Sequence, residues 1–194
     1  MYAIAMLRPS RRATCPLVIA LVAFVGLTAA SAQAASKRAD RLLAPQAACP
    51  APADTSTAAQ LGAMSCLVNY ARTHAGVPVL HESKTLDLAG TLKLNAEIRC
   101  DAFTHTPCGQ PFQAVFSAAG YSLGTAYSAG ENLAYSGGAL ASPQAIMQAW
   151  LASPDHRQNL LSTDWTSFGL ALHSNATFLG SGNVTLWANE FAGP

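Results

Sequence analysis

The sequence predicts an α+β fold, with a single domain in which helices pack in layers on a sheet. Three observations lead to this class. Helical and strand patterns are mixed along the chain without β-α-β alternation. The pattern is continuous over residues 57–194, with no second linker and no internal repeat. That stretch of about 138 residues is long enough to bury roughly two-thirds of its unfolded surface.

The first 34 residues have the order of a secretory signal peptide. Three arginines precede an uncharged apolar run from Cys15 to Ala30, and small residues follow with an A-x-A match at Ala32 and Ala34. This order predicts a signal peptide over residues 1–34 and a secreted, extracellular protein. The apolar run is short for a membrane span of about 20 residues, although an uncleaved anchor is the alternative.

Residues 35–56 are predicted to be a linker, because alanine and proline with few large apolar side chains cannot build a core. Signal cleavage would remove three of the 11 basic residues and none of the 10 acidic ones, which leaves a formal charge of −2. No basic patch then favours nucleic acid or an anionic membrane surface as a partner. No membrane span is expected in the mature chain.

The first half of the domain is predicted to be mainly helical. Apolar residues recur at helical spacing over residues 57–73 and 85–102, which predicts two long helices. Gly76 ends the first of them, and Val77 to Leu80 has extended character. A third, shorter helix is predicted over residues 110–119.

The second half alternates between strands and short helices. Ser128 to Tyr135 has strand character on a glycine-flanked segment. Ser142-Pro143 and Ser153-Pro154 each combine a capping serine with a proline in the first turn, which predicts two further helices. Two strands are predicted over residues 168–173 and 184–191, joined by a polar, glycine-containing loop.

Four cysteines remain after signal cleavage, and an even number in an exported chain favours disulfides. Three pairings are possible. We favour Cys49–Cys66 and Cys100–Cys108, because both loops close locally. A zinc site made of these cysteines is disfavoured, since C-x-x-C spacing is missing. The second bridge would close a loop that contains His105 and would limit the freedom of its imidazole.

Three polar residues in apolar surroundings form our candidate site: His105, Glu131 and His156. A Thr-Pro pair follows His105 and favours a loop there. Glu131 is an isolated acid in an apolar strand, where a buried carboxylate is costly unless it is paired. His156 falls in the first turn of a helix, whose dipole favours the neutral imidazole.

If folding brings these residues together, two imidazoles and a carboxylate could bind Zn²⁺ or another divalent cation, or transfer a proton. The alternatives are a surface histidine at His105 and a structural carboxylate at Glu131. Neither G-x-S-x-G nor H-E-x-x-H is present. Arg157 and Asn159 are expected to be structural residues or to lie at the rim of the site. Three other histidines are expected at the surface: His74, His81 and His173.

Several of these segments occur together in one order that spans residues 57–194. They include Phe103-Thr104-His105, Gly130-Glu131-Asn132-Leu133-Ala134, Trp150-Leu151-x-Ser153-Pro154-x-His156-Arg157-x-Asn159-Leu160-Leu161 and Trp187-x-x-x-Phe191. The ordered set resembles the CAP superfamily of cysteine-rich secretory proteins, antigen 5 and pathogenesis-related 1 proteins. The resemblance is nearest to the bacterial SCP-like secreted branch.

The resemblance implies a three-layer α-β-α sandwich with a central cleft, occupying residues 57–194. The two cleft histidines and the first cleft acid of the family correspond to His105, His156 and Glu131, which implies a divalent-metal site. The second glutamate of eukaryotic members is replaced by Ser153, which we interpret as a helix cap. Asp155 stands where the bacterial branch usually has glycine.

Two functions are compatible with these expectations. Family members are linked to lipid or sterol binding, to envelope and defence roles and, in isolated cases, to proteolysis. The first hypothesis is a secreted module whose cleft binds a lipid-like ligand or an envelope component, with an optional divalent metal. The second is a hydrolase in which His105 and His156 hold a metal or activate water. We favour binding, because the sequence shows no convincing nucleophile.

Overall fold

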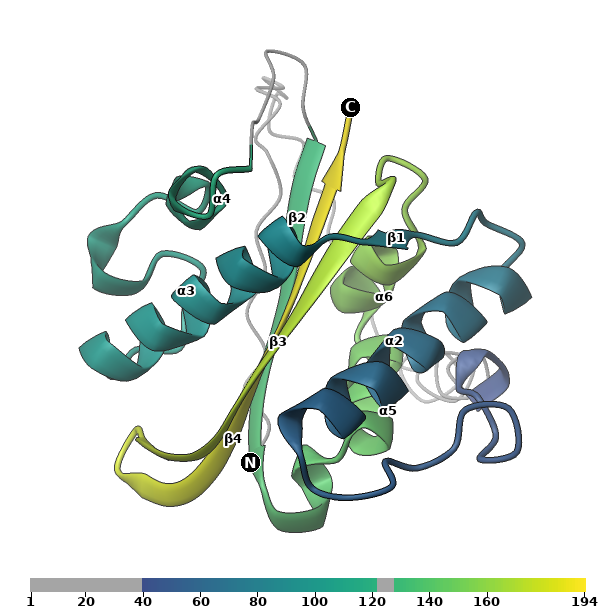
Figure 1. Cartoon of the computed structure of the whole chain (residues 1–194), viewed down its shortest axis with the longest axis horizontal. Helices are drawn as coiled ribbons and strands as arrows, with labels where there is room; N and C mark the ends of the chain where they lie inside the picture. Colours follow the sequence, from purple (N-terminus) through teal and green to yellow (C-terminus); the bar gives the residue numbers. More distant parts are fainter. Residues whose placement is uncertain (1–39, 122–127) are drawn as a thin grey trace, which may run out of the picture.

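The computed structural model describes residues 40–121 and 128–194 (Figure 1). The predicted signal peptide and the start of the predicted linker lie outside these residues, so both stay predictions. None of the described helices is long and apolar enough to cross a membrane.

Two long helices form where their periodicity predicts them. Helix α2 spans Thr57–His74, and α3 spans Lys84–Cys100. Serine caps both helices: the Ser56 side chain accepts a hydrogen bond from the Ala59 amide at 3.2 Å, and Ser83 occupies the same position before α3.

The predicted third helix is much shorter than residues 110–119. Helix α4 spans only Ala114–Ala118, and a 3₁₀ turn, η1 (Pro107–Gly109), precedes it. The reason lies in Pro111, because a residue before proline is disfavoured in helical conformation. Gln110 accordingly has extended angles, with φ −75° and ψ 141°.

Four strands form one sheet in the order β1-β3-β4-β2. They span His81–Glu82 (β1), Ser128–Gly137 (β2), Ser167–Phe178 (β3) and Ser181–Gly193 (β4). Strand β4 is antiparallel to both β2 and β3, and β1 is parallel to β3.

The loop predicted between the last two strands is a hairpin instead. Strands β3 and β4 extend across it with register shifts between His173 and Phe178. Only Leu179 and Gly180 turn the chain, both at positive φ (49° and 74°). The polar residues near this end made it resemble a loop, although here they lie on a solvent-exposed strand pair.

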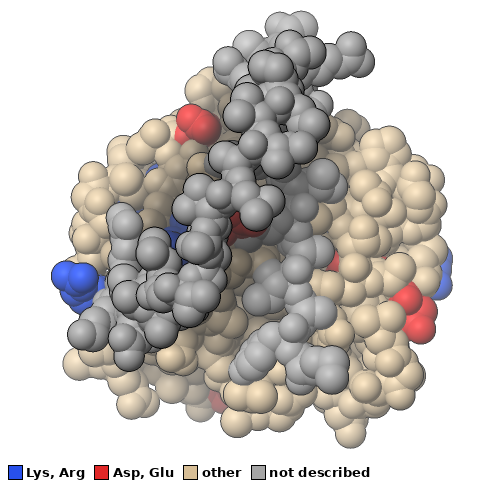
Figure 2. Space-filling model, turned by 180° about the vertical axis from the view of Figure 1, so that it is seen from behind, with Lys and Arg blue, Asp and Glu red and all other residues tan. Residues whose placement is uncertain are grey.

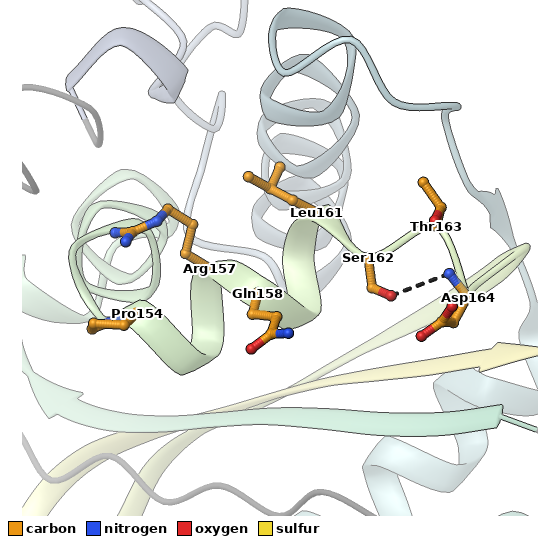
Figure 3. Close-up of a pocket in the computed structure, with 7 residues that line it drawn as sticks. All are labelled: Pro154, Arg157, Gln158, Leu161, Ser162, Thr163 and Asp164. Carbon is orange, nitrogen blue, oxygen red and sulfur yellow. Dashed lines mark hydrogen bonds between the residues drawn. The ribbon is translucent and has the colours of Figure 1, made fainter.

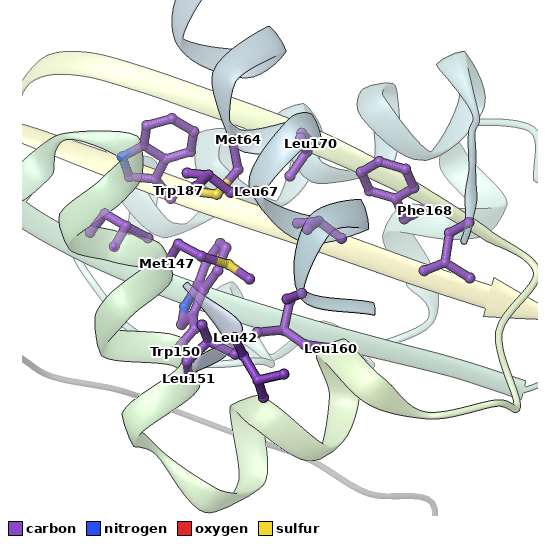
Figure 4. Packing of buried hydrophobic residues seen from close by; sticks show 14 of the residues in the cluster. Leu42, Met64, Leu67, Met147, Trp150, Leu151, Leu160, Phe168, Leu170 and Trp187 are labelled. Atoms are coloured by element: carbon purple, nitrogen blue, oxygen red, sulfur yellow. The ribbon is translucent and has the colours of Figure 1, made fainter. Parts of the chain in front are cut away.

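The elements pack as the predicted three-layer α-β-α sandwich (Figure 1). Helices α3 and α4 cover one face of the sheet. Helix α2 lies on the other face. The same face carries three elements that follow β2 in the sequence: η2 (Gly138–Ala141), α5 (Pro143–Ala152) and α6 (Pro154–Leu161). The largest core cluster fills this second side and contains Trp150 and Trp187, both fully buried (Figure 4).

The two predicted serine caps differ. The Ser142 side chain accepts a hydrogen bond from the Ala145 amide at 3.4 Å and so caps α5. Ser153 has the extended backbone of a capping residue before α6, but its side chain makes no capping hydrogen bond. The prediction for Ser153 is therefore right for the backbone and wrong for the side chain.

Both disulfides join the predicted cysteines, Cys49–Cys66 and Cys100–Cys108. The first bridge fixes the described part of the predicted linker to α2. Leu42 and Ala44 of this stretch lie in the main core cluster, and the Ala44 carbonyl accepts a hydrogen bond from the Gln144 side chain at 2.8 Å. The composition of residues 35–56 gave no sign of this packing, because Leu42 is one of few large apolar residues there.

Candidate functional site

Glu131 lies at the centre of a buried polar cluster between β2 and α3. Its Oε1 atom is 2.5 Å from His105 Nδ1, and its Oε2 atom is 3.1 Å from Lys93 Nζ. All three side chains are at most 3% exposed. The structure therefore brings two of the predicted site residues, His105 and Glu131, into direct contact.

Lys93 connects the carboxylate to the loop that carries His105. Its Nζ atom donates to the His105 carbonyl at 2.5 Å and lies 5.4 Å from the centre of the Phe112 ring. The Cys100–Cys108 bridge closes the same loop. Helix, loop and strand are thus held together around one ammonium group.

Two further carboxyl groups belong to this cluster. Glu190 on β4 is paired directly opposite Glu131 in the sheet, and Glu97 on α3 accepts a hydrogen bond from the Thr104 amide at 3.3 Å. Burial, reinforced by the charge of Glu131, raises the pKa of Glu97 to about 8. The same two causes raise the pKa of Glu190 well above its usual range. With a pKa of about 8, Glu97 is mostly protonated near neutral pH.

Sequence reasoning did not identify Lys93, Glu97 or Glu190, although a signal was present. Lys93 and Glu97 are four residues apart and continue the helical stripe of Leu86 and Ala89, which are buried core positions. A lysine and a glutamate at such positions indicate a buried pair or network.

His156 approaches β2 from the other side of the sheet. It is fully buried in α6, and its carbonyl accepts a hydrogen bond from the Asn132 side chain at 3.0 Å. Asn159 donates from the same helix to the Glu131 carbonyl at 3.1 Å. Successive side chains of a strand point to opposite faces, so Asn132 meets α6 while Glu131 meets α3. Convergence of the His156 ring with the other two residues stays a prediction.

A zinc ion at Glu131 fits these residues poorly. Both carboxylate oxygens are engaged, one by His105 Nδ1 and the other by Lys93. In the described ranges, no group of three or more His, Cys, Asp and Glu side chains is arranged to hold a metal ion. Zinc binding itself stays a prediction.

The residues expected to be structural or exposed have those roles. Arg157 donates to the Leu151 carbonyl at 2.6 Å, and Asn159 joins α6 to β2. His74, His81 and His173 are exposed.

An open groove of about 450 Å³ lies along α6 and the loop after it (Figure 3). Its side chains are mostly polar, and the Asp164 amide donates to Ser162 Oγ at 3.1 Å. A second groove of about 360 Å³ lies beside Asp54 and Ser142. Neither groove is lined by a predicted site residue. The first is lined by Pro154, Arg157, Gln158, Leu161, Ser162, Thr163 and Asp164.

Comparison with known proteins places this architecture in context. The model of the cysteine-rich secretory protein family, CAP, matches residues 67–187. No curated protein sequence matches the chain.

Three solved structures share the fold. An extracellular protein from Bacillus anthracis with an SCP domain has a TM-score of 0.59 at 17% identity, over 71% of this chain and 41% of its own. An outer surface protein from Borrelia burgdorferi has a TM-score of 0.59 at 18% identity, over 71% of this chain and 95% of its own. A cysteine-rich secretory protein from Staphylococcus aureus has a TM-score of 0.53 at 14% identity, over 72% of this chain and 40% of its own. The chain thus spans about two fifths of the Bacillus and Staphylococcus proteins, and identities this low show the fold alone.

Proposed function

Because this chain belongs to the cysteine-rich secretory protein (CAP) family, we propose that it is an extracellular binding protein whose domain recognises a lipid-like ligand or a component of the cell envelope. The structural relatives from Bacillus and Borrelia are described as extracellular and outer surface proteins. Two disulfides suit an oxidising compartment, and the predicted signal peptide provides the route there.

One observation carries the choice of binding over catalysis. His105, Glu131 and Lys93 are engaged with one another and almost wholly buried. A general base must come within hydrogen-bond reach of its substrate, and these side chains instead hold the loop, the helix and the strand together. Their arrangement supports a scaffold for a binding surface.

The surface chemistry supports a partner other than nucleic acid. The face in Figure 2 has few charged residues among its described atoms, and they do not gather into one basic patch. Nucleic-acid binding relies on clustered lysine and arginine. The open groove along α6 offers mixed polar and apolar contacts of the kind that an envelope component could use.

One observation favours the alternative of an extracellular hydrolase. A carboxylate oxygen can only accept, so the Nδ1 atom of His105 carries the proton of its bond to Glu131. In the neutral ring, Nε2 is then the basic atom, as in a carboxylate-oriented catalytic histidine. Nε2 is buried and has no hydrogen-bond partner among the described residues. Zinc held by the histidines would be an optional component of either function.

Two assays on the mature protein, one of binding and one of turnover, would distinguish the two functions. Binding would be measured on phospholipid vesicles and on purified envelope glycan, and turnover on peptide, ester and glycan substrates with and without a chelator. We expect saturable binding to vesicles or glycan and no turnover. His105→Ala would be compared with His173→Ala, which changes an exposed histidine. Turnover that His105→Ala abolishes and His173→Ala preserves would establish the hydrolase.

A further inference from the structure

We infer that Lys93 is a built-in cation at Glu131 and occupies the position that a divalent metal would need there. This inference concerns the buried cluster alone and does not depend on which ligand the protein binds. Its starting point is the ion pair between Lys93 Nζ and Glu131 Oε2, at 3.1 Å between two side chains that are 1% and 0% exposed.

The ammonium group is held in place from three directions. Besides Glu131, it contacts the His105 carbonyl at 2.5 Å and the Phe112 ring at 5.4 Å from the ring centre. A carbonyl, a carboxylate and an aromatic face all favour positive charge. Lys93 therefore cannot turn away to admit a metal ion without leaving its own charge buried and unpaired.

Lys93 also supplies the positive charge that Glu131 needs. Glu97 and Glu190 lie in the same buried cluster, and burial together with the charge of Glu131 raises the pKa of both carboxyl groups. The Lys93 ammonium is the cation that pairs with the Glu131 carboxylate. A divalent ion beside that ammonium would add strong repulsion in a site that excludes water.

This arrangement assigns Glu131 the role of a positioning residue. Its Oε1 atom fixes the His105 ring through Nδ1 and leaves Nε2 as the atom that can meet a ligand. Carboxylates orient histidines in this way in many sites, without binding the ligand themselves. Any metal held by His105 would use Nε2 and would not use the Glu131 carboxylate.

Zinc titrations followed by calorimetry and by the His105 ring signals in NMR would test this inference. The full mature protein would be compared with Lys93→Met, which removes the charge, and with Lys93→Arg, which keeps it. We expect stoichiometric zinc to leave the His105 ring unchanged in the wild type and in Lys93→Arg. Lys93→Met should gain a one-to-one zinc site, with an affinity at least about tenfold higher than that of the wild type. The double variant with Glu131→Gln should lose this site.

For proteins that fold without added metal, two results would overturn the inference. One is a wild-type His105 ring that responds to stoichiometric zinc and loses the response in Glu131→Gln, because Glu131 would then bind metal beside Lys93. The other is a folded Lys93→Met protein that binds no zinc. If Lys93→Met does not fold by itself, recovery of its near-UV circular dichroism on adding zinc or calcium supports the inference. Failure of both ions to restore it contradicts the inference.

Discussion

At the residue scale, Glu97 links the stability of the fold to pH. Its pKa rises from 4.5 to about 8 on folding, so the folded protein binds an extra proton between these values. The contribution of this proton to the free energy of unfolding is fully present below pH 4.5 and is lost as pH rises through about 8. The free energy of unfolding should therefore fall with rising pH, by up to about 1.4 kcal/mol per pH unit from this group.

Urea denaturation between pH 5 and pH 8 would measure this slope. Glu97→Gln is the matched control, because the amide oxygen can still accept the hydrogen bond from the Thr104 amide. We expect a smaller slope in the variant, with the remainder due to Glu190. An unchanged slope would show that Glu97 does not take up the proton.

The two lysines of α3 should differ sharply on truncation. Lys93→Ala leaves Glu131 buried without its cation and should cost about 3–5 kcal/mol, as for other broken buried pairs. Lys84 forms an ion pair with Asp87 at 3.0 Å, but its side chain is 90% exposed. Lys84→Ala should leave the midpoint of urea denaturation unchanged. Similar losses in both variants would contradict the buried pairing of Lys93.

The sequence alone indicates two members of the buried cluster. His105 and Glu131 stand out because each is an isolated polar residue in an apolar segment. Lys93 and Glu97 are harder to recognise, because only their place on the apolar stripe of α3 marks them. The network as a whole is a property of the assembled fold, since it joins residues of α3, β2 and β4.

At the scale of the elements, two similar serines should differ as caps. Ser142→Ala removes a side-chain hydrogen bond at the start of α5 and should cost about 1 kcal/mol. Ser153→Ala removes no capping bond at the start of α6 and should change stability very little. Thermal unfolding of both variants would check this pair. A larger loss for Ser153→Ala would mean that its side chain caps α6 after all.

The contact between α3 and β3 depends on a missing side chain. A Cβ atom on Gly169 would lie 2.2 Å from the carbonyl carbon of Leu86, which is backbone of α3. Gly169→Ala should therefore separate the helix from the sheet and lower the midpoint of urea denaturation strongly. Gly62→Ala is the control, since a Cβ there meets nothing within 4 Å. That change should stabilise α2 by roughly 0.5–1 kcal/mol. Two equally tolerated variants would contradict this close packing.

Element type was easier to predict than element length. The ends of α2 and α3 were predicted within two residues, because periodicity and capping serines agree there. The β3–β4 hairpin was predicted too short, since its polar ends gain their order from pairing with each other. Helix α4 is shorter than the sequence predicts, because Gln110 precedes Pro111 and is extended.

At the scale of the whole molecule, the two disulfides make a direct prediction for the exported protein. Mass spectrometry under non-reducing conditions should find no free thiol in the mature chain and a linked Cys100–Cys108 peptide. Loss of a native bridge typically costs about 2–5 kcal/mol in small secreted domains. A Cys100 peptide linked to Cys49 or Cys66 would contradict the pairing.

The position of β4 in the sheet also determines when the domain can fold. Strand β4 follows β2 and β3 along the chain but lies between them, and β2 pairs with no other described strand. Helices α2, α3, α5 and α6 are therefore synthesised before the complete sheet on which they pack can form. Pairing Glu131 with Glu190 closes a loop that contains α5, α6 and β3, and such long-range closure slows folding. A nascent chain that stays open until β4 has been made is compatible with the export that the signal peptide predicted over residues 1–34 implies.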